Sequence, residues 1–312
     1  MKSKKNILLG LMLTLVVSAT AQVTEHEAKL RSEATKAEED GWRAGGVTTL
    51  NFSQMYFSNW AAGGENSYAL NGLVNLFASY RKSSFTWDNM LIMGYGFINQ
   101  EVNGFRKTDD RFDFTSKVGY RAFQNFFYSG LVNFRTQFTE GFDFVRDPQG
   151  ETPISRFLAP AYMISALGIS YQPNSNFSVF LAPFTNRLTI VNDSILSSQG
   201  AFGVTPGDRT LMEFGGYLRA NFTKNDFKSE WLRNVTFATN IDLFSNYLHN
   251  PQNINVNWET LIALRVNNFL SVNINTHLIW DQNVKFANAD TGAEETRVQF
   301  RQLLGVGLSY NF

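Results

Sequence analysis

Alternation between apolar and small or polar residues runs through the sequence from about Val47 to the last residue. In the C-terminal segment the apolar positions are Leu304, Val306, Leu308, Tyr310 and Phe312. A period of two is typical of a β-strand whose two faces meet different surroundings. A soluble sandwich would have to bury the apolar face of each strand against another sheet. Nearly every strand carries the same bulky stripe, so nothing is left to cover it.

The composition supports a surface that meets something other than bulk water. Aromatic residues make up 15% of the chain and charged residues only 17%, against about 25% charged in an average soluble domain. Past residue 22 no run approaches the roughly 18 apolar residues that a spanning helix needs, which excludes a helical membrane protein. The absence of cysteine excludes disulfides, thiolate metal sites and lipoprotein acylation. With 27 basic and 27 acidic residues the chain has no net positive charge that would attract nucleic acid, so no nucleic-acid partner is expected.

The first 21 residues have the form of a cleavable signal peptide. A lysine-rich start, an apolar stretch over residues 7–17 and the small-x-small site at residues 19–21 follow in order. Cleavage changes the formal charge from 27 − 27 = 0 to 24 − 27 = −3, because it removes three lysines. Residues 22–41 are charged and lack large aromatics, and we expect a short exposed helix or tail in the periplasm. Residues 42–312 are the predicted barrel.

Twelve alternating segments can be counted. Their centres lie near residues 52, 74, 92, 116, 132, 165, 180, 216, 240, 260, 275 and 304. The short connections are expected at 83–84, 123–125, 173–175, 224–234 and 267–269, and the long ones near 99–110, 140–156, 187–208 and 282–296. Short connections on one side and long ones on the other are typical of outer-membrane barrels. The sequence therefore predicts an all-β, antiparallel, up-and-down transmembrane β-barrel of about 12 strands in the bacterial outer membrane, with 10 or 14 strands as alternatives.

Two partners follow from this fold class. Outer-membrane lipid would cover the apolar faces, with aromatic residues at both strand ends forming two interfacial belts. The barrel-assembly machinery would read the last strand, in which Leu308, Tyr310 and Phe312 alternate.

Parity fixes part of the register, because a strand must keep its apolar face outward through each turn. Pairing Val266 with Leu270 sets Glu259 opposite His277. Pairing Ala122 with Phe126 sets Asp113 opposite Arg135, and the turn at 83–84 sets Ser79 opposite Asp88. The candidate lumen residues are Asp113, Lys117, Arg135, Glu213, Arg219, Glu259, His277 and Arg301.

No group of residues predicts an enzyme, a cofactor or a metal site. A lipid-facing hydrolase needs a nucleophile, a histidine and an orienting group at the lipid face, whereas His277 points inward by parity. Glu259 and His277 supply only two ligands, too few for a metal, and we expect them to form a lumen pair.

The loop over residues 186–208 carries too much apolar surface to leave in water. Pairing within an extended wall, folding into the lumen or docking a partner protein would each cover it. We favour a packed loop that narrows or covers the extracellular mouth, with Arg187 and Asp193 meeting lumen charges such as Glu213 and Arg219.

Several motifs carry a resemblance to a known family. The N-terminal ones are NFSQ at 51–54, SNWAAGGENS at 58–67 and RKTDD at 106–110, and further ones lie at 157–162, 188–193, 200–204, 213–217 and 250–254. Over most of residues 42–312 the chain resembles the Bacteroidota outer-membrane family catalogued as domain of unknown function 3078. The resemblance implies an outer-membrane barrel and supplies no catalytic residues.

Two functions remain open at this point. The first is a narrow channel or passive transporter for small solutes, because the lumen face is polar and charged. The second is a structural or partner-binding barrel with an envelope protein as its partner, because the motif-rich loops resemble fixed contact surfaces. Conductance distinguishes the two.

Overall fold

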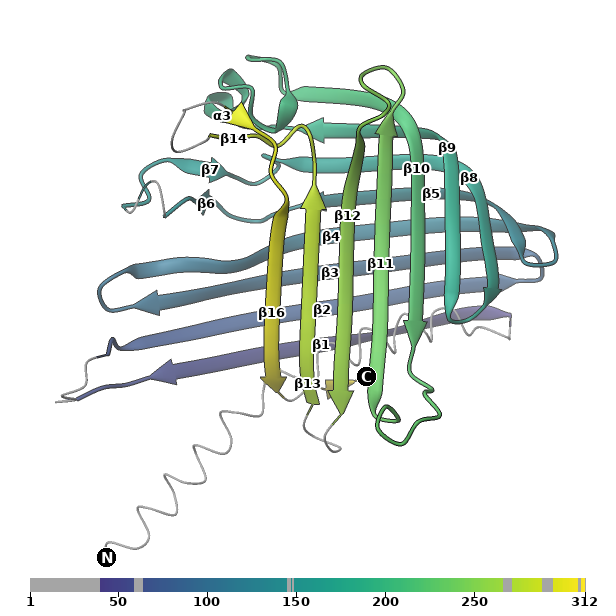
Figure 1. Ribbon diagram of the computed structural model, residues 1–312, viewed down its shortest axis with the longest axis horizontal. Coiled ribbons are helices and arrows are strands. Elements are labelled where there is room, and N and C mark those ends of the chain that lie inside the picture. Colours follow the sequence, from purple (N-terminus) through teal and green to yellow (C-terminus); the bar gives the residue numbers. More distant parts are fainter. Residues whose placement is uncertain are drawn as a thin grey trace, which may run out of the picture.

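The computed structural model describes residues 40–58, 64–144, 147, 149–265, 271–287, 294–307 and 310–311. These residues form one large antiparallel sheet in which consecutive strands are neighbours (Figure 1). The strands of this sheet are β1 (Gly41–Met55), β2 (Ser67–Lys82), β3 (Phe85–Gln100), β4 (Gly104–Phe123), β5 (Phe126–Thr136), β8 (Ala161–Asn174), β9 (Phe177–Ile190), β10 (Thr210–Lys224), β11 (Val235–Asn246), β12 (Ile254–Arg265), β13 (Ser271–Trp280), β16 (Gln299–Gly307) and β17 (Tyr310–Asn311). The all-β, antiparallel, up-and-down prediction is confirmed.

Short elements decorate one end of the sheet. β6 (Gly141–Phe142) pairs with β7 (Pro153–Ser155), and β14 (Phe286–Ala287) pairs with β15 (Glu294–Glu295). The connection between β9 and β10 contains the helix α3 (Ser194–Ser198) and the 3-10 turn η1 (Ala201–Gly203). No helix in the described part of the chain is long and apolar enough to cross a membrane.

The twelve predicted segment centres all fall inside strands of the large sheet. The sheet also contains β17, which pairs with β1 at two positions, while β16 pairs with β13. The C-terminal segment thus supplies both ends of the strand order. The number of strands in a closed barrel stays a prediction.

Some predicted features lie outside the described residues. These are the signal peptide, nearly all of the charged tail, the pairing of Val266 with Leu270, and the side chains of Leu308, Tyr310 and Phe312.

The predicted loop at 99–110 is wrong. β3 and β4 continue as a hairpin, and only residues 101–103 connect them. Charged residues in this stretch suggested a loop, but Lys107 and Asp110 form an ion pair at 2.8 Å, and Phe97 stacks on Phe105 with ring centroids 4.7 Å apart. The contact of Phe97 with Phe105 joins the two strands, and cross-strand aromatic pairs stabilise strand pairing.

Two short turns also differ from their predicted bounds. The expected pairing of Ala122 with Phe126 is wrong, because Phe123 pairs with Phe126 and a bulge takes up Ala122. The turn then needs a residue at positive φ, and Gln124 adopts φ 42°. The bulge restores parity, so Asp113 opposes Arg135 as predicted. The turn predicted at 173–175 is shifted, since Asn174 pairs with Phe177.

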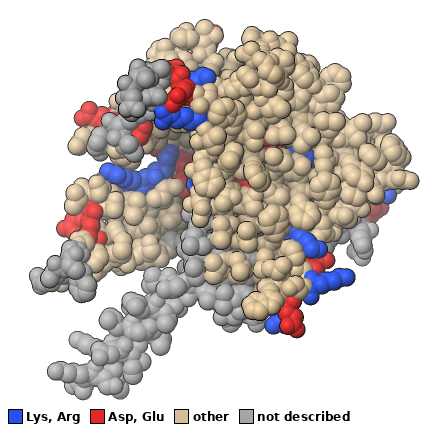
Figure 2. All heavy atoms as spheres, in the orientation of Figure 1, with Lys and Arg blue, Asp and Glu red and all other residues tan. Residues whose placement is uncertain are grey.

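The two faces of the sheet have inverted polarity compared with a soluble protein. Large apolar side chains of the strands are exposed, among them Tyr128, Leu167, Leu181, Phe184 and Met212. Polar side chains at alternate positions are buried, among them Ser129, Asn133, Ser170, Thr185 and Asp242. Figure 2 shows the outer face over β10–β12 almost free of charged side chains. The inner face of the described sheet is therefore largely polar, and it also holds an apolar cluster built around Leu131, Phe180, Tyr217 and Phe244.

Candidate functional site

Six charged side chains from five strands meet on the inner face of the sheet. β4 supplies two of them, and β5, β10, β11 and β12 supply one each, because alternation places them opposite the exposed apolar positions. We call this set the inner ion network. It consists of Arg111, Asp113, Arg135, Arg219, Asp242 and Glu259.

Two contacts of the inner ion network join strands that are not neighbours. Nη2 of Arg111 on β4 lies 3.2 Å from Oε1 of Glu259 on β12, although five strands stand between β4 and β12 in the sheet order. Nη2 of Arg135 on β5 lies 3.2 Å from Oδ2 of Asp242 on β11, with three strands between them. The sheet therefore curves until opposite parts of its inner face meet through side chains.

Asp242 is the most heavily bonded carboxylate of the network and is 5% exposed. Arg219 donates to it through Nε at 2.6 Å and Nη2 at 3.0 Å, which is the two-pronged geometry that guanidinium groups favour. The hydroxyl of Tyr217 donates at 2.6 Å and the amide of Asn257 at 3.2 Å. A carboxylate with this many donors is fully satisfied, so its geometry is tightly constrained.

The second buried carboxylate of the network belongs to Asp113. Arg111 contacts its Oδ2 at 3.0 Å and Arg135 contacts the same oxygen at 3.5 Å. The amide of Asn133 donates to Oδ1 at 2.7 Å. The predicted pair of Asp113 and Arg135 is therefore one of several ion pairs in the network.

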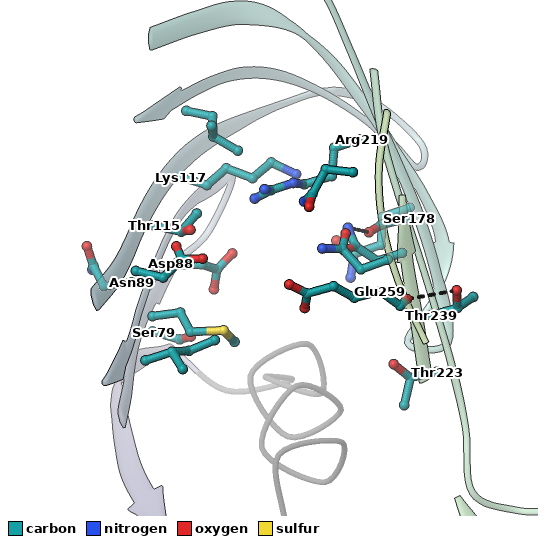
Figure 3. A pocket seen from close by; sticks show the side chains of 18 of the residues that line it. Ser79, Asp88, Asn89, Thr115, Lys117, Ser178, Arg219, Thr223, Thr239 and Glu259 are labelled. Carbon is teal, nitrogen blue, oxygen red and sulfur yellow. Dashed lines mark hydrogen bonds between the residues drawn. The ribbon is translucent and has the colours of Figure 1, made fainter. Parts of the chain in front are cut away.

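A cavity of about 200 Å³ lies beside the network (Figure 3). Its wall extends from the network to the turn between β8 and β9, where Ser175 and Asn176 line it. Hydroxyl, amide and charged side chains dominate the wall, including Ser79, Asp88, Lys117, Asn221 and Asn240. The cavity is thus suited to a hydrated or polar solute.

A second ion cluster lies near the opposite end of the sheet. Arg187 on β9 is buried and contacts the carboxylates of Asp281 and Glu213, the latter at 3.6 Å. Glu213 also accepts bonds at 3.2 Å from the side-chain amides of Asn246 and Asn283. The predicted contact of Arg187 with Glu213 is present.

The connection between β9 and β10 is packed, as expected from its apolar content. Val191, Leu196 and Val204 are buried against Ala159. A Cβ on Gly203 would lie 2.7 Å from Cβ of Asn283, so η1 rests directly on the connection that follows β13.

The expected contact of Asp193 with a lumen charge such as Arg219 is wrong. Asp193 caps α3 by accepting from the backbone N–H groups of Ile195 and Leu196, at 2.9 and 2.8 Å. Its other oxygen contacts Arg156 at 3.0 Å. The N–H of Leu196, followed by the charge of Arg156, holds the pKa of this carboxyl below its usual value. Asp193 caps the helix instead of reaching the lumen, because the N–H groups in the first turn of α3 have no partners within the helix.

The structure brings most of the predicted lumen residues together. Asp113, Arg135, Arg219 and Glu259 belong to the inner ion network and Lys117 lines the same cavity. His277 pairs with Glu259 in register, with 3.7 Å between Nε2 and Oε1, and contacts Asn257 at 2.6 Å. Arg301 on β16 pairs with His277 in register, is half-exposed, and lies 3.4 Å from Asp109 rather than in the inner ion network.

Arg111 and Asp242 were missing from the candidate set. Asp242 alternates with Ile241 and Leu243, so the same period-two rule places it on the inner face.

Comparison with known proteins gives a partial family match and distant structural similarities. Residues 52–142 match a family model described as "Protein of unknown function (DUF3078)". The match covers less than half of the chain and includes the RKTDD segment. No curated protein sequence matches the chain significantly.

Among solved structures, an outer membrane channel from Pseudomonas putida superposes with a TM-score of 0.38 at 10% identity, over 88% of this chain and 97% of that one. The translocator domain of the autotransporter NalP from Neisseria meningitidis gives 0.36 at 10% identity, over 92% and 94%. The porin NanC gives 0.35 at 10% identity, over 85% and 98%. These low scores leave the function to be argued from the residues of this chain.

Proposed function

We propose that this chain is an outer-membrane β-barrel that acts as a narrow channel or passive transporter for small solutes. The inverted polarity of the sheet supports the location, because a face carrying Leu167, Leu181 and Phe184 is suited to hydrocarbon. In this proposal β16 and β17 are one strand that closes twelve strands into a cylinder. A signal peptide exports the chain, the barrel-assembly machinery inserts it, and its origin is a member of the Bacteroidota.

One observation carries the channel function. The inner ion network bridges the enclosed space through Arg111 with Glu259 and Arg135 with Asp242, and it leaves a polar cavity beside these pairs. Rings of charged side chains at a narrow point set selectivity in channels. Because side chains from opposite walls touch at the inner ion network, only small solutes can pass it.

The packed connection between β9 and β10 narrows the path at the other end. Gly203 of this connection packs against Asn283, which follows β13. Below it, the ion cluster of Arg187 joins β9 to β10 and to the residue after β13. We place this connection at the extracellular mouth.

The test is single-channel recording with the full-length mature protein in planar bilayers. We expect small, discrete conductance steps. Replacing residues 190–203 by a short glycine-serine linker widens the mouth and raises the conductance, while folding is checked by heat-modifiable gel mobility. Silent bilayers from correctly folded protein would rule out the channel.

A second candidate is a barrel that binds an envelope protein. β3 and β4 have 16 and 20 residues, whereas a tilted strand crosses a membrane with about 9–11. The hairpin tip therefore projects, and it exposes Val102 at 83% and Phe105 at 56%. Silent bilayers together with a partner that is lost from Val102→Ser and Phe105→Ser variants would favour this function.

A further inference from the structure

Two cationic side chains face each other across the cavity. Lys117 extends from β4 and Arg219 from β10, and Figure 3 shows the two side chains pointing toward one another. Like charges that converge in a partly desolvated space repel each other, so such an arrangement needs compensating negative charge.

The negative charge available to the two cations is unequal. Arg219 is neutralised by Asp242, to which it donates through Nε and Nη2, and its Nη1 group makes no bond to the described residues. Lys117 forms no ion pair or hydrogen bond with the described residues. Its Nζ lies 5.4 Å from the centroid of the Phe180 ring, and the carboxylate of Asp88 attracts it only at longer range. Nη1 of Arg219 and Nζ of Lys117 thus both keep donors that are not used by the described residues.

The carboxylate nearest to Lys117 in register is already engaged. Asp88 on β3 pairs with Lys117 across the sheet, but its Oδ1 lies 2.6 Å from Nη2 of Arg81. The site therefore keeps one positive charge in excess. Ser79, 1% exposed, adds a hydroxyl without a hydrogen-bond partner to the wall of the same cavity.

We propose that the cavity binds one small monovalent anion, such as a short carboxylate or a halide, between Nζ of Lys117 and Nη1 of Arg219. This inference rests on the proposed channel function and names its solute class. A single charge matches the excess on Lys117. A second negative charge on the ligand would be repelled by the carboxylates of Asp113 and Glu259, which line the cavity as well.

The first test is ion selectivity in planar bilayers under a tenfold potassium chloride gradient. We expect the wild-type channel to prefer chloride over potassium. Lys117→Gln lowers the permeability ratio by about threefold or more, because it removes the positive charge that the site holds in excess. Lys117→Arg preserves the ratio, and so does Lys228→Gln, which changes an exposed lysine in the turn between β10 and β11.

The outcomes separate this inference from the channel function. A wild-type channel whose selectivity is unchanged by Lys117→Gln overturns the anion site and leaves the channel standing. If the wild type does not conduct, the channel fails and bromide-soaked crystals decide the site. An anomalous peak between Lys117 and Arg219 that disappears in Lys117→Gln supports it, and the absence of a peak in the wild type overturns it.

Discussion

Asp242→Asn tests whether the inner ion network holds the fold together. The substitution keeps the shape of the side chain and removes the charge that Arg219 contacts at 2.6 Å and Arg135 at 3.2 Å. Removing one partner of a buried pair costs about 3–5 kcal/mol, since the remaining charge stays desolvated. The side chain of Arg219 is only 13% exposed and that of Arg135 is 28% exposed. Water reaches Arg135 more easily, so we expect the lower end of this range, about 3 kcal/mol.

The matched control is Asp226→Asn. Its side chain is 73% exposed and lies 3.1 Å from Nζ of Lys224, and exposed pairs of this kind contribute about 0–1 kcal/mol. The assay is reversible urea unfolding of both variants in phospholipid vesicles, followed by tryptophan fluorescence. The reasoning is refuted if the free energies of unfolding of the two variants differ by less than about 1 kcal/mol.

Three further predictions concern assembly, lipid exposure and pH. Deleting Phe312 lowers the amount of protein in the outer membrane, measured by fractionation, and an unchanged amount argues against a terminal assembly signal. Leu167→Arg, on the exposed face in mid-strand, costs about 2–4 kcal/mol in urea unfolding, whereas Asn240→Arg, at the cavity, costs less; equal losses contradict the facing of the strands. Because the folded pKa of Asp193 is depressed, its stabilisation is complete above about pH 4 and is lost as the pH falls further. Pepsin cleavage of residues 190–203 should rise below that pH, and Asp193→Asn should be cleaved already at pH 5.

The strands were predictable because their signal is local. Alternation is visible in neighbouring residues alone. The parity of the apolar positions on both sides of a turn then predicted the pairing of Glu259 with His277 and of Asp113 with Arg135. The bulge at Ala122 was hidden, since a bulge depends on how Phe123 stacks on Phe126 across the turn. The charged stretch of the β3–β4 hairpin was misassigned because its partners are distant in sequence: Lys107 and Asp110 bond to Thr139, which follows β5.

The contacts across the inner space had no sequence signal. Alternation assigns Arg111 and Glu259 to the inner face, but which inner residues meet depends on the curvature of the whole sheet. Arg111 and Glu259 are separated by 148 positions and by five intervening strands. The excess charge of Lys117 had no sequence signal either, because it depends on the ion pair that Arg81 forms with Asp88.

This separation in sequence also predicts when the network forms during folding. Arg135 and Asp242 lie 107 positions apart on strands that never pair, so they meet only after the sheet has curved around. Interactions absent from the folding transition state slow unfolding and leave the folding rate nearly unchanged. We therefore expect Asp242→Asn to leave the rate of insertion into vesicles within about twofold of wild type. Its unfolding rate in urea should instead rise by about two orders of magnitude, the equivalent of about 3 kcal/mol. Slower insertion with unchanged unfolding would mean that the network forms before the sheet closes.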